Sequence, residues 1–243
     1  MSDIRSAYEE WLPGWCDSLG LSVAFKGQKD QTPGGGGILD ALEKSETFAD
    51  SSNVGEIEWK RFGVKNGIAV DHFKIKDSPV FTAQWSCTVK NSSFEAFEKF
   101  TNDCFDSPPD WDDTYLFAEK LEERNGVLLV KWHFKAAPLG KREMLYLTIP
   151  HKTSEKSTVH YISVTCSKHP RTKGFTRAFN FCPSYDRCIL QAGVDAKTMK
   201  LEHCMTTAIG GWIPNAAWNN VFFKPVVKQM FAEGMRVRNL YFE

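Results

Sequence analysis

Residues 210–239 read GGWIPNAAWNNVFFKPVVKQMFAEGMRVRN and carry the strongest fold signal in the chain. Two glycines end the preceding segment, and Pro214 suits the first turn of a helix, where a backbone N–H has no helical acceptor. Apolar side chains then recur at helical spacing, and they are Trp218, Val221, Phe222, Pro225, Val226, Met230 and Phe231. The pattern predicts a long C-terminal helix with a wide apolar face that is rich in aromatic side chains.

The polar residues of this helix are expected on its other side. They are Lys224, Lys228, Arg236 and Arg238, with Glu233 as the one acid. A helix with one wide apolar face needs an apolar partner surface, and a β-sheet offers one because the two bury each other's apolar faces.

Upstream of the helix, the apolar period changes to two, which is typical of half-buried strands. Asn66-Gly67 and Asn125-Gly126 are strong hairpin signals. The predicted strands are 56–61, 68–76, 80–89, 115–123, 127–134, 142–149, 158–167, 174–181, 186–191 and 199–208. Short connections between them require antiparallel pairing.

Three helices are expected before and between these strands. Residues 3–19 have apolar side chains at helical spacing, although Pro13 weakens the middle, and residues 38–48 suggest a short second helix. Ser92-x-x-Glu95 has the capping-box pattern and begins a third helix with an aromatic stripe.

The expected fold is therefore α+β. A curved antiparallel sheet of about nine strands wraps around a long C-terminal helix and is preceded by N-terminal helices. We expect one domain over residues 1–238, with the N-terminal helices in 1–50 and the core in 55–237. Residues 239–243, NLYFE, resemble most of a protease-cleavage tag and are left out of the fold.

Composition and charge exclude several classes of function. Lys plus Arg equals Asp plus Glu at 30 each, which argues against nucleic acid as the main partner because phosphate binding needs a basic surplus. Seven scattered cysteines with no CxxC pair indicate reduced, buried thiols. Neither a signal peptide nor a membrane span is visible, so we expect a cytoplasmic monomer that meets membranes only peripherally.

Catalytic and metal-binding patterns are also missing from the sequence. It contains no GxSxG or HExxH motif, and His203 and Cys204 would point to opposite faces of a strand. The acidic run at residues 110–113 does not match a calcium loop, and no Lys-Ser/Thr follows the glycines at 34–37. We expect no enzyme activity, no metal and no cofactor.

Four motifs, in this order, make residues 55–237 similar to the START (steroidogenic acute regulatory protein-related lipid transfer) family of helix-grip folds. They are Asp110-Trp111-Asp112, Lys141-Arg142-Glu143, His169-Pro170 with Thr176-Arg177-Ala178, and Gly210-Gly211-Trp212-Ile213-Pro214. They resemble the family's Trp-Asp pair, its Arg-Asp strand start (with Glu for Asp), its Pro…Val-Arg strand and the start of its last helix.

The resemblance implies an internal cavity for one lipid, such as a sterol, phospholipid, ceramide or carotenoid. It also implies that the loop 135–141 and the last helix act as a lid. Some members place a buried acid–base pair in the cavity. Here Thr148 stands at the position of the basic member, with no obvious matching acid in 127–134, so a weakly polar ligand is favoured over a charged phospholipid.

The candidate ligand-binding residues are inward positions of the strands and the apolar side of the last helix. The apolar candidates are Trp85, Trp132, Phe134, Tyr146, Phe181, Met205, Trp218, Phe222 and Val226, and the polar ones are His133, Arg142, Thr148 and His203. For membrane contact and lid movement we expect Ala136, Ala137, Pro138, Leu139, Trp212 and Ile213. The predicted function is transport of one hydrophobic molecule between membranes. A ligand-sensing regulatory module and, less favoured, a hydrolase or cyclase on the same fold are the alternatives.

Overall fold

A computed structural model describes residues 4–21, 37–40, 42–43, 58–74, 81–106, 115–135, 140–152, 158–165, 179–181, 184–190, 198–209 and 223–242. Its helices include α1 (Ile4–Tyr8), α2 (Leu12–Ser18), α4 (Phe94–Asp106) and α6 (Phe223–Tyr241). Its strands are β1 (Lys60–Lys65), β2 (Ile68–Lys74), β3 (Phe81–Val89), β4 (Tyr115–Arg124), β5 (Val127–Lys135), β6 (Lys141–Lys152), β7 (Thr158–Thr165), β8 (Phe179–Phe181), β9 (Ser184–Leu190) and β10 (Met199–Ile209). The motifs at 110–112, 169–170, 176–178 and 210–214 lie outside these described residues.

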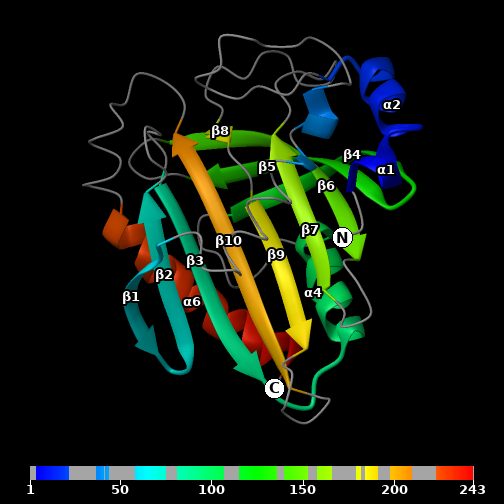
Figure 1. The fold of residues 1–243 in the computed structure, drawn as a ribbon. Helices are drawn as coiled ribbons and strands as arrows, with labels where there is room; N and C mark the ends of the chain where they lie inside the picture. Colours follow the sequence, from blue (N-terminus) through cyan, green and yellow to red (C-terminus); the bar gives the residue numbers. More distant parts are fainter. Residues whose placement is uncertain are drawn as a thin grey trace.

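The strands form one antiparallel sheet in the order β1-β2-β3-β10-β9-β7-β6-β5-β4, and β8 pairs with β10 beside this path. The sheet curves, and α6 crosses behind it (Figure 1). This confirms the predicted fold class. In the middle of the sheet β3 pairs with β10. This pairing places Trp85 opposite His203, which is far from it in the sequence.

Two predicted hairpins are confirmed by their backbone angles. Asn66 and Gly67 have φ of 50° and 75° between β1 and β2, and Asn125 and Gly126 have φ of 52° and 77° between β4 and β5. Two successive positive φ angles define the type I′ turn, whose twist matches that of the strands, and Asn-Gly tolerates them best. The first strand lies at Lys60–Lys65, four residues later than the expected start at residue 56.

The helices differ from expectation at two points. The helix predicted over 3–19 is broken into α1 and α2, with Trp11 at the N-cap of α2 and Pro13 in its first turn. A proline without an N–H begins a helix more easily than it continues one, which explains the break. The cap of α4 is Ser93 instead of Ser92, because the Ser93 Oγ accepts the Ala96 N–H at 3.3 Å.

The sheet has two covered faces. We call the inward face the one that packs against α4 and α6, where Ile68, Trp85, Phe97 and Val227 belong to one buried apolar cluster. On the other side, the outer face, residues such as Leu129 pack with the N-terminal helices in a second cluster. Such alternation along each strand is what period-two patterning predicts.

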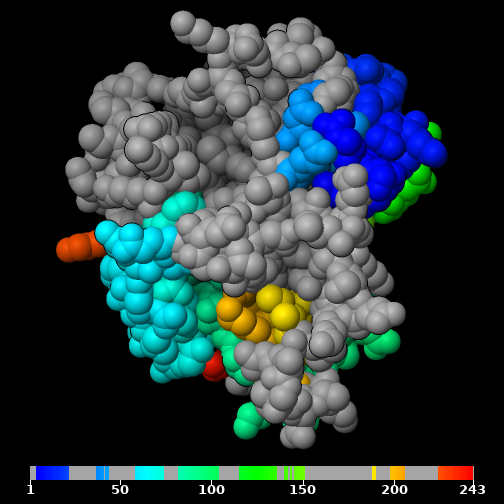
Figure 2. Space-filling view, in the orientation of Figure 1, coloured from blue at the N-terminus to red at the C-terminus, as the bar shows by residue number. Residues whose placement is uncertain are grey.

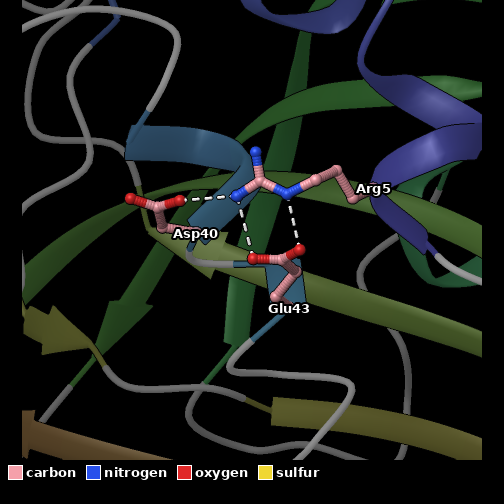
Figure 3. A network of polar contacts seen from close by, with 3 residues as sticks. All are labelled: Arg5, Asp40 and Glu43. Carbon is pink, nitrogen blue, oxygen red and sulfur yellow. Dashed lines mark hydrogen bonds and ion pairs between the residues drawn. The ribbon is translucent and has the colours of Figure 1, made fainter.

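The N-terminal segment is fastened to the outer face mainly by apolar packing. Ile4 and Leu12 are fully buried there, and the Tyr8 hydroxyl donates to the Pro150 carbonyl of β6. Arg5 also binds Asp40 at 2.7 Å and Glu43 at 2.5 and 2.9 Å (Figure 3). Solvent reaches these ion pairs and screens the charges, so the apolar packing contributes more to holding the segment in place.

The C-terminal helix continues past residue 238, where the sequence placed the end of the domain. Tyr241 packs on Phe100 of α4 with ring centroids 5.4 Å apart, and Phe242 is buried. Tyr241 and Phe242 thus pack on the fold, whereas Asn239 and Leu240 are exposed. Among the described residues, no helix is long and apolar enough to cross a membrane.

Candidate functional site on the inward face of the sheet

The inward face brings together most of the apolar residues that the sequence nominated. Trp85 is buried in the apolar cluster with Tyr146, and Trp132, Phe134 and Val226 pack against that cluster. Residues that pair directly across two strands share a face. The register therefore adds Thr148 (opposite Leu128), His203 (opposite Trp85) and Met205 (opposite Ala83).

Other nominated residues cannot be assigned to the site. Arg142 pairs in the backbone with Phe134, and Phe181 pairs with Thr207, but their side chains lie outside the described part of the structure. The same holds for all of Ala136, Ala137, Pro138, Leu139, Trp212, Ile213, Trp218 and Phe222.

His133 does not share the inward face with Trp132 and Phe134. His133 lies between Trp132 and Phe134 on β5, so its side chain points to the outer face. There its Nδ1 is 3.4 Å from Glu143 Oε1, and its ring stacks on Phe117 with centroids 4.0 Å apart. Three successive residues of one strand cannot all face the same side, and this alternation is a signal that the sequence already contained.

His133 provides a test of this placement through pH. Burial lowers the pKa of His133, and the Lys131 charge acts in the same direction, while Glu143 and Glu119 oppose it. The unfolded chain therefore binds a proton at a higher pH, near 6.5, than the folded chain does, so the protein loses stability as the pH falls below about 6.5. We expect His133→Gln to make the loss of unfolding free energy between about pH 7 and pH 5 smaller, measured by urea denaturation. An unchanged loss would contradict the burial of the neutral ring.

Aromatic rings line the β5 side of the inward face. Trp132 and Phe134 stack with ring centroids 6.0 Å apart, while Tyr115 meets Trp132 edge-on at 4.8 Å and Tyr146 meets it at 6.2 Å. Trp132 and Phe134 are only partly buried although they point toward the helices. Solvent therefore reaches a surface that is apolar, rigid and rich in π faces.

A buried acid lies opposite this face, and the sequence had placed it elsewhere. Glu233 of α6 is only 7% exposed. Its Oε1 accepts the Trp85 Nε1–H at 3.0 Å and lies 3.6 Å from His203 Nε2. The expectation that Glu233 joins the basic residues on the far side of the helix is wrong, because it follows Met230 by three residues and Val226 by seven. That spacing places it on the apolar stripe, where the sequence pattern could have located it.

The cluster of Trp85, His203 and Glu233 joins three elements of the fold. The His203 ring also stacks on Trp85, with centroids 5.9 Å apart. A buried carboxylate is costly unless it is hydrogen-bonded or paired, and here it has both kinds of contact. Among the described residues, the cluster is therefore a buried polar contact that links α6 to the two central strands β3 and β10.

Gly234 lets α6 approach the sheet closely enough for these contacts. A Cβ at this position would lie 2.9 Å from Ile68 Cγ2 and 3.1 Å from Trp85 Cδ2. Both neighbours are fully buried or nearly so. Only glycine, which has no Cβ, therefore fits at position 234 between the helix and the strands β2 and β3.

The described cysteines lie in the interior of the protein, and with the acidic and histidine side chains they are the groups that could act as a nucleophile or bind a metal ion. Cys16, Cys87, Cys188 and Cys204 are buried. Burial raises the pKa of Cys188 to about 12, so that thiol is not a ready nucleophile. Within the described ranges, no three His, Cys, Asp or Glu residues come close enough to hold a metal ion.

A curved antiparallel sheet closed around one long C-terminal helix defines the helix-grip class of folds. No family model and no curated protein sequence matches this chain. Its structure is similar to human StAR-related lipid transfer protein 5, with a TM-score of 0.62, 16% identity, and 83% of this chain and 96% of that chain covered.

Two further solved structures give the same result. The lipid transfer and protein localization domain of human StarD13 (DLC2) matches with a TM-score of 0.59 and 15% identity, covering 82% of this chain and 95% of that domain. A STAR-related lipid transfer protein from Xanthomonas axonopodis matches with a TM-score of 0.60 and 16% identity, covering 74% and 97%. The chain has a START-like fold, as its motifs indicated.

Proposed function

We propose that the chain binds one apolar, lipid-like molecule between the inward face of the sheet and α6, and carries it between membranes. The observation that supports this most is the partly open aromatic surface of Trp132 and Phe134 inside a START-like fold. The similar structures are named as lipid transfer proteins or domains. In this proposal the protein is a cytoplasmic monomer that binds without catalysing a reaction.

The physical need for a carrier follows from the cost of exposing hydrocarbon to water. Burial of apolar area contributes about 25 cal/mol per Å², or roughly 0.8 kcal/mol per methylene group. A chain of about sixteen carbons would therefore lose on the order of 13 kcal/mol on entering water. A protein surface that replaces most of these apolar contacts lowers the barrier to transfer, provided that the ligand can still leave.

The polar groups available on the inward face favour a weakly polar ligand. Thr148 offers a hydroxyl. When His203 is protonated, its positive charge balances the negative charge of the Glu233 carboxylate, so neither charge is left for a charged ligand. Such groups suit a ligand hydroxyl or carbonyl better than a second full charge, which would have to be buried without its own partner. Sterols, carotenoids and ceramides fit this description better than charged phospholipids.

Native mass spectrometry of the purified chain tests the proposal. We expect a bound molecule of lipid mass in a ratio of one per chain, which organic extraction removes and which can then be identified. A chain that carries no such molecule, and that acquires none from a panel of sterols, ceramides, carotenoids and phospholipids, would contradict the proposed function.

Trp132→Ala is expected to weaken binding of a fluorescent sterol or fatty-alcohol probe by about tenfold, because an indole ring no longer covers the ligand. Phe117→Ala is the matched control, since Phe117 is an exposed aromatic residue on the outer face of the neighbouring strand. Displacement titrations measure both affinities. Equal losses in the two variants would show that the inward face is not the binding surface.

A vesicle assay separates a carrier from a ligand-sensing module. Labelled ligand is placed in donor vesicles, and its arrival in acceptor vesicles is followed with and without the protein. A carrier accelerates arrival in proportion to its concentration, whereas a sensor binds the ligand and leaves the transfer rate unchanged.

A further inference from the structure

The first strand of the sheet exposes apolar and basic side chains side by side. β1 reads KRFGVK and forms one edge of the sheet, because it pairs only with β2 among the described strands. Phe62 is 45% exposed and Val64 is 63% exposed. Lys60, Arg61 and Lys65 surround them and are exposed as well.

The helix α6 packs on β3 and β2 and also reaches β1 and the turn that follows it. The rings of Phe231 and Phe62 lie 6.3 Å apart, and a Cβ on Gly63 would meet Phe231 Cζ at 3.7 Å. Farther along the helix, Arg238 Nη1 donates to the Asn66 carbonyl at 2.6 Å. The helix therefore contacts β1 at Phe62 and Gly63, through Phe231, and the β1–β2 turn at Asn66, through Arg238.

Two exposed lysines extend this side of the helix toward its start. Lys228 and Lys224 precede Phe231 by three and seven residues, so they lie on the same side of α6. Both are exposed. In Figure 2 the surface of β1 and β2 is open to solvent, with the first part of α6 projecting beside it. We define the basic edge as Lys60, Arg61, Phe62, Val64, Lys65, Lys224 and Lys228.

Few acids offset these charges within the described ranges. Glu58 is exposed near the start of β1, Asp71 is paired with Arg61, and the acid of α6, Glu233, is buried against the sheet. The whole chain has equal numbers of acidic and basic residues. The basic edge is therefore a local concentration of positive charge on a neutral protein, which orients the protein toward an anionic surface.

We propose that the basic edge docks on the surface of an anionic lipid bilayer. Lysine and arginine side chains gain free energy near such a surface, and Phe62 and Val64 between them can enter the boundary between head groups and acyl chains. This surface is distinct from the lid loop at 136–139, and its docking does not require that the proposed ligand be bound. Because α6 also covers the inward face, docking places the membrane beside the helix that encloses the ligand.

A second copy of the chain fits the same edge less well. In an antiparallel pairing of two β1 strands centred on residues 62 and 63, Lys60 of one copy would lie opposite Lys65 of the other. Like charges directly opposite each other destabilise strand pairing. Exposed lysines on an edge strand are a common means of preventing such pairing.

Co-sedimentation of the full chain with vesicles tests the proposal. Vesicles of phosphatidylcholine alone are compared with vesicles containing about 30% phosphatidylserine, at low and at high salt. We expect binding to the anionic vesicles and its loss at high salt. Lys224→Glu with Lys228→Glu is expected to weaken that binding by about 30-fold, and Val64→Ser by about fivefold.

The matched control is Lys90→Glu with Lys120→Glu, which makes the same change in net charge at two exposed lysines that belong neither to the basic edge nor to the loop 135–141. We expect this control to bind within about threefold of the unmodified chain. Equal losses in both double variants, a loss in the control alone, or no binding of the unmodified chain to anionic vesicles would each overturn the proposal. If the chain sediments as a dimer and Val64→Ser dissociates that dimer, the basic edge binds a second copy of the chain and the proposal of membrane docking is wrong.

Discussion

Gly234→Leu is expected to lower the free energy of unfolding by about 3 kcal/mol and to abolish ligand binding. Even the first carbon of the new side chain would lie 2.9 Å from Ile68 Cγ2 and 3.1 Å from Trp85 Cδ2. Ile68 is 0% exposed and Trp85 is 1% exposed, so neither can move aside without disturbing the core. The helix must then shift away from the sheet, which separates Glu233 from Trp85.

The control for this prediction is Gly63→Ala on β1. A Cβ there would meet Phe231 Cζ at 3.7 Å, which is an ordinary contact. We expect the control to change the free energy of unfolding by less than about 0.5 kcal/mol in urea denaturation. Unchanged stability of Gly234→Leu would show that α6 does not approach β2 and β3 as closely as described.

His203→Leu is expected to lower the free energy of unfolding by about 3 kcal/mol, because the buried Glu233 carboxyl group loses the polar imidazole beside it. Glu233→Leu is expected to cost about 2 kcal/mol, since the Trp85 Nε1–H then has no acceptor at 3.0 Å. The two changes together should cost about 1–2 kcal/mol less than the sum of the single changes, because no carboxylate is left to bury.

Denaturation of the four proteins in this double-mutant cycle gives the coupling directly. Strict additivity would mean that His203 and Glu233 do not interact, and that the polar cluster does not hold α6 to the sheet. The cycle also separates stability from function, because we expect the double variant to fold while its preference among weakly polar ligands changes.

Much of the fold could be predicted because its signals are local. Asn66-Gly67 and Asn125-Gly126 specify turns by their tolerance of positive φ, and the strands between them alternate with a period of two. The long C-terminal helix follows from apolar spacing alone. These features need only neighbouring residues, so one sequence is enough to locate them.

What the sequence left out depends on contacts between distant residues. The pairing of β3 with β10 brings Trp85 beside His203, and nothing near either residue indicates the partner. Glu233 looked like a solvated acid because it stands among basic residues, although its spacing from Met230 put it on the buried side. The place of His133 follows from local sequence alone, because strict alternation along β5 puts it on the opposite face from Trp132 and Phe134.

The two sides of α6 connect the proposed binding site with the proposed docking surface. Val227, Met230 and Glu233 are buried against the sheet, whereas Lys224 and Lys228 are exposed on the side of α6 that carries Phe231. A displacement of this one helix would therefore change access to the inward face and the shape of the basic edge together. This coupling is the reason to expect ligand exchange while the protein is docked.

Photo-crosslinking with a long-chain alcohol that carries a diazirine in its hydrocarbon chain tests the central claim most directly. Peptides labelled after illumination are identified by mass spectrometry. We predict labelling of inward residues, including Trp132, Tyr146 and Met205, and its suppression by excess unlabelled alcohol. Labels confined to the outer face, for example at Phe117 or on α1 and α2, or labels that excess ligand does not suppress, would contradict a ligand held between the sheet and α6.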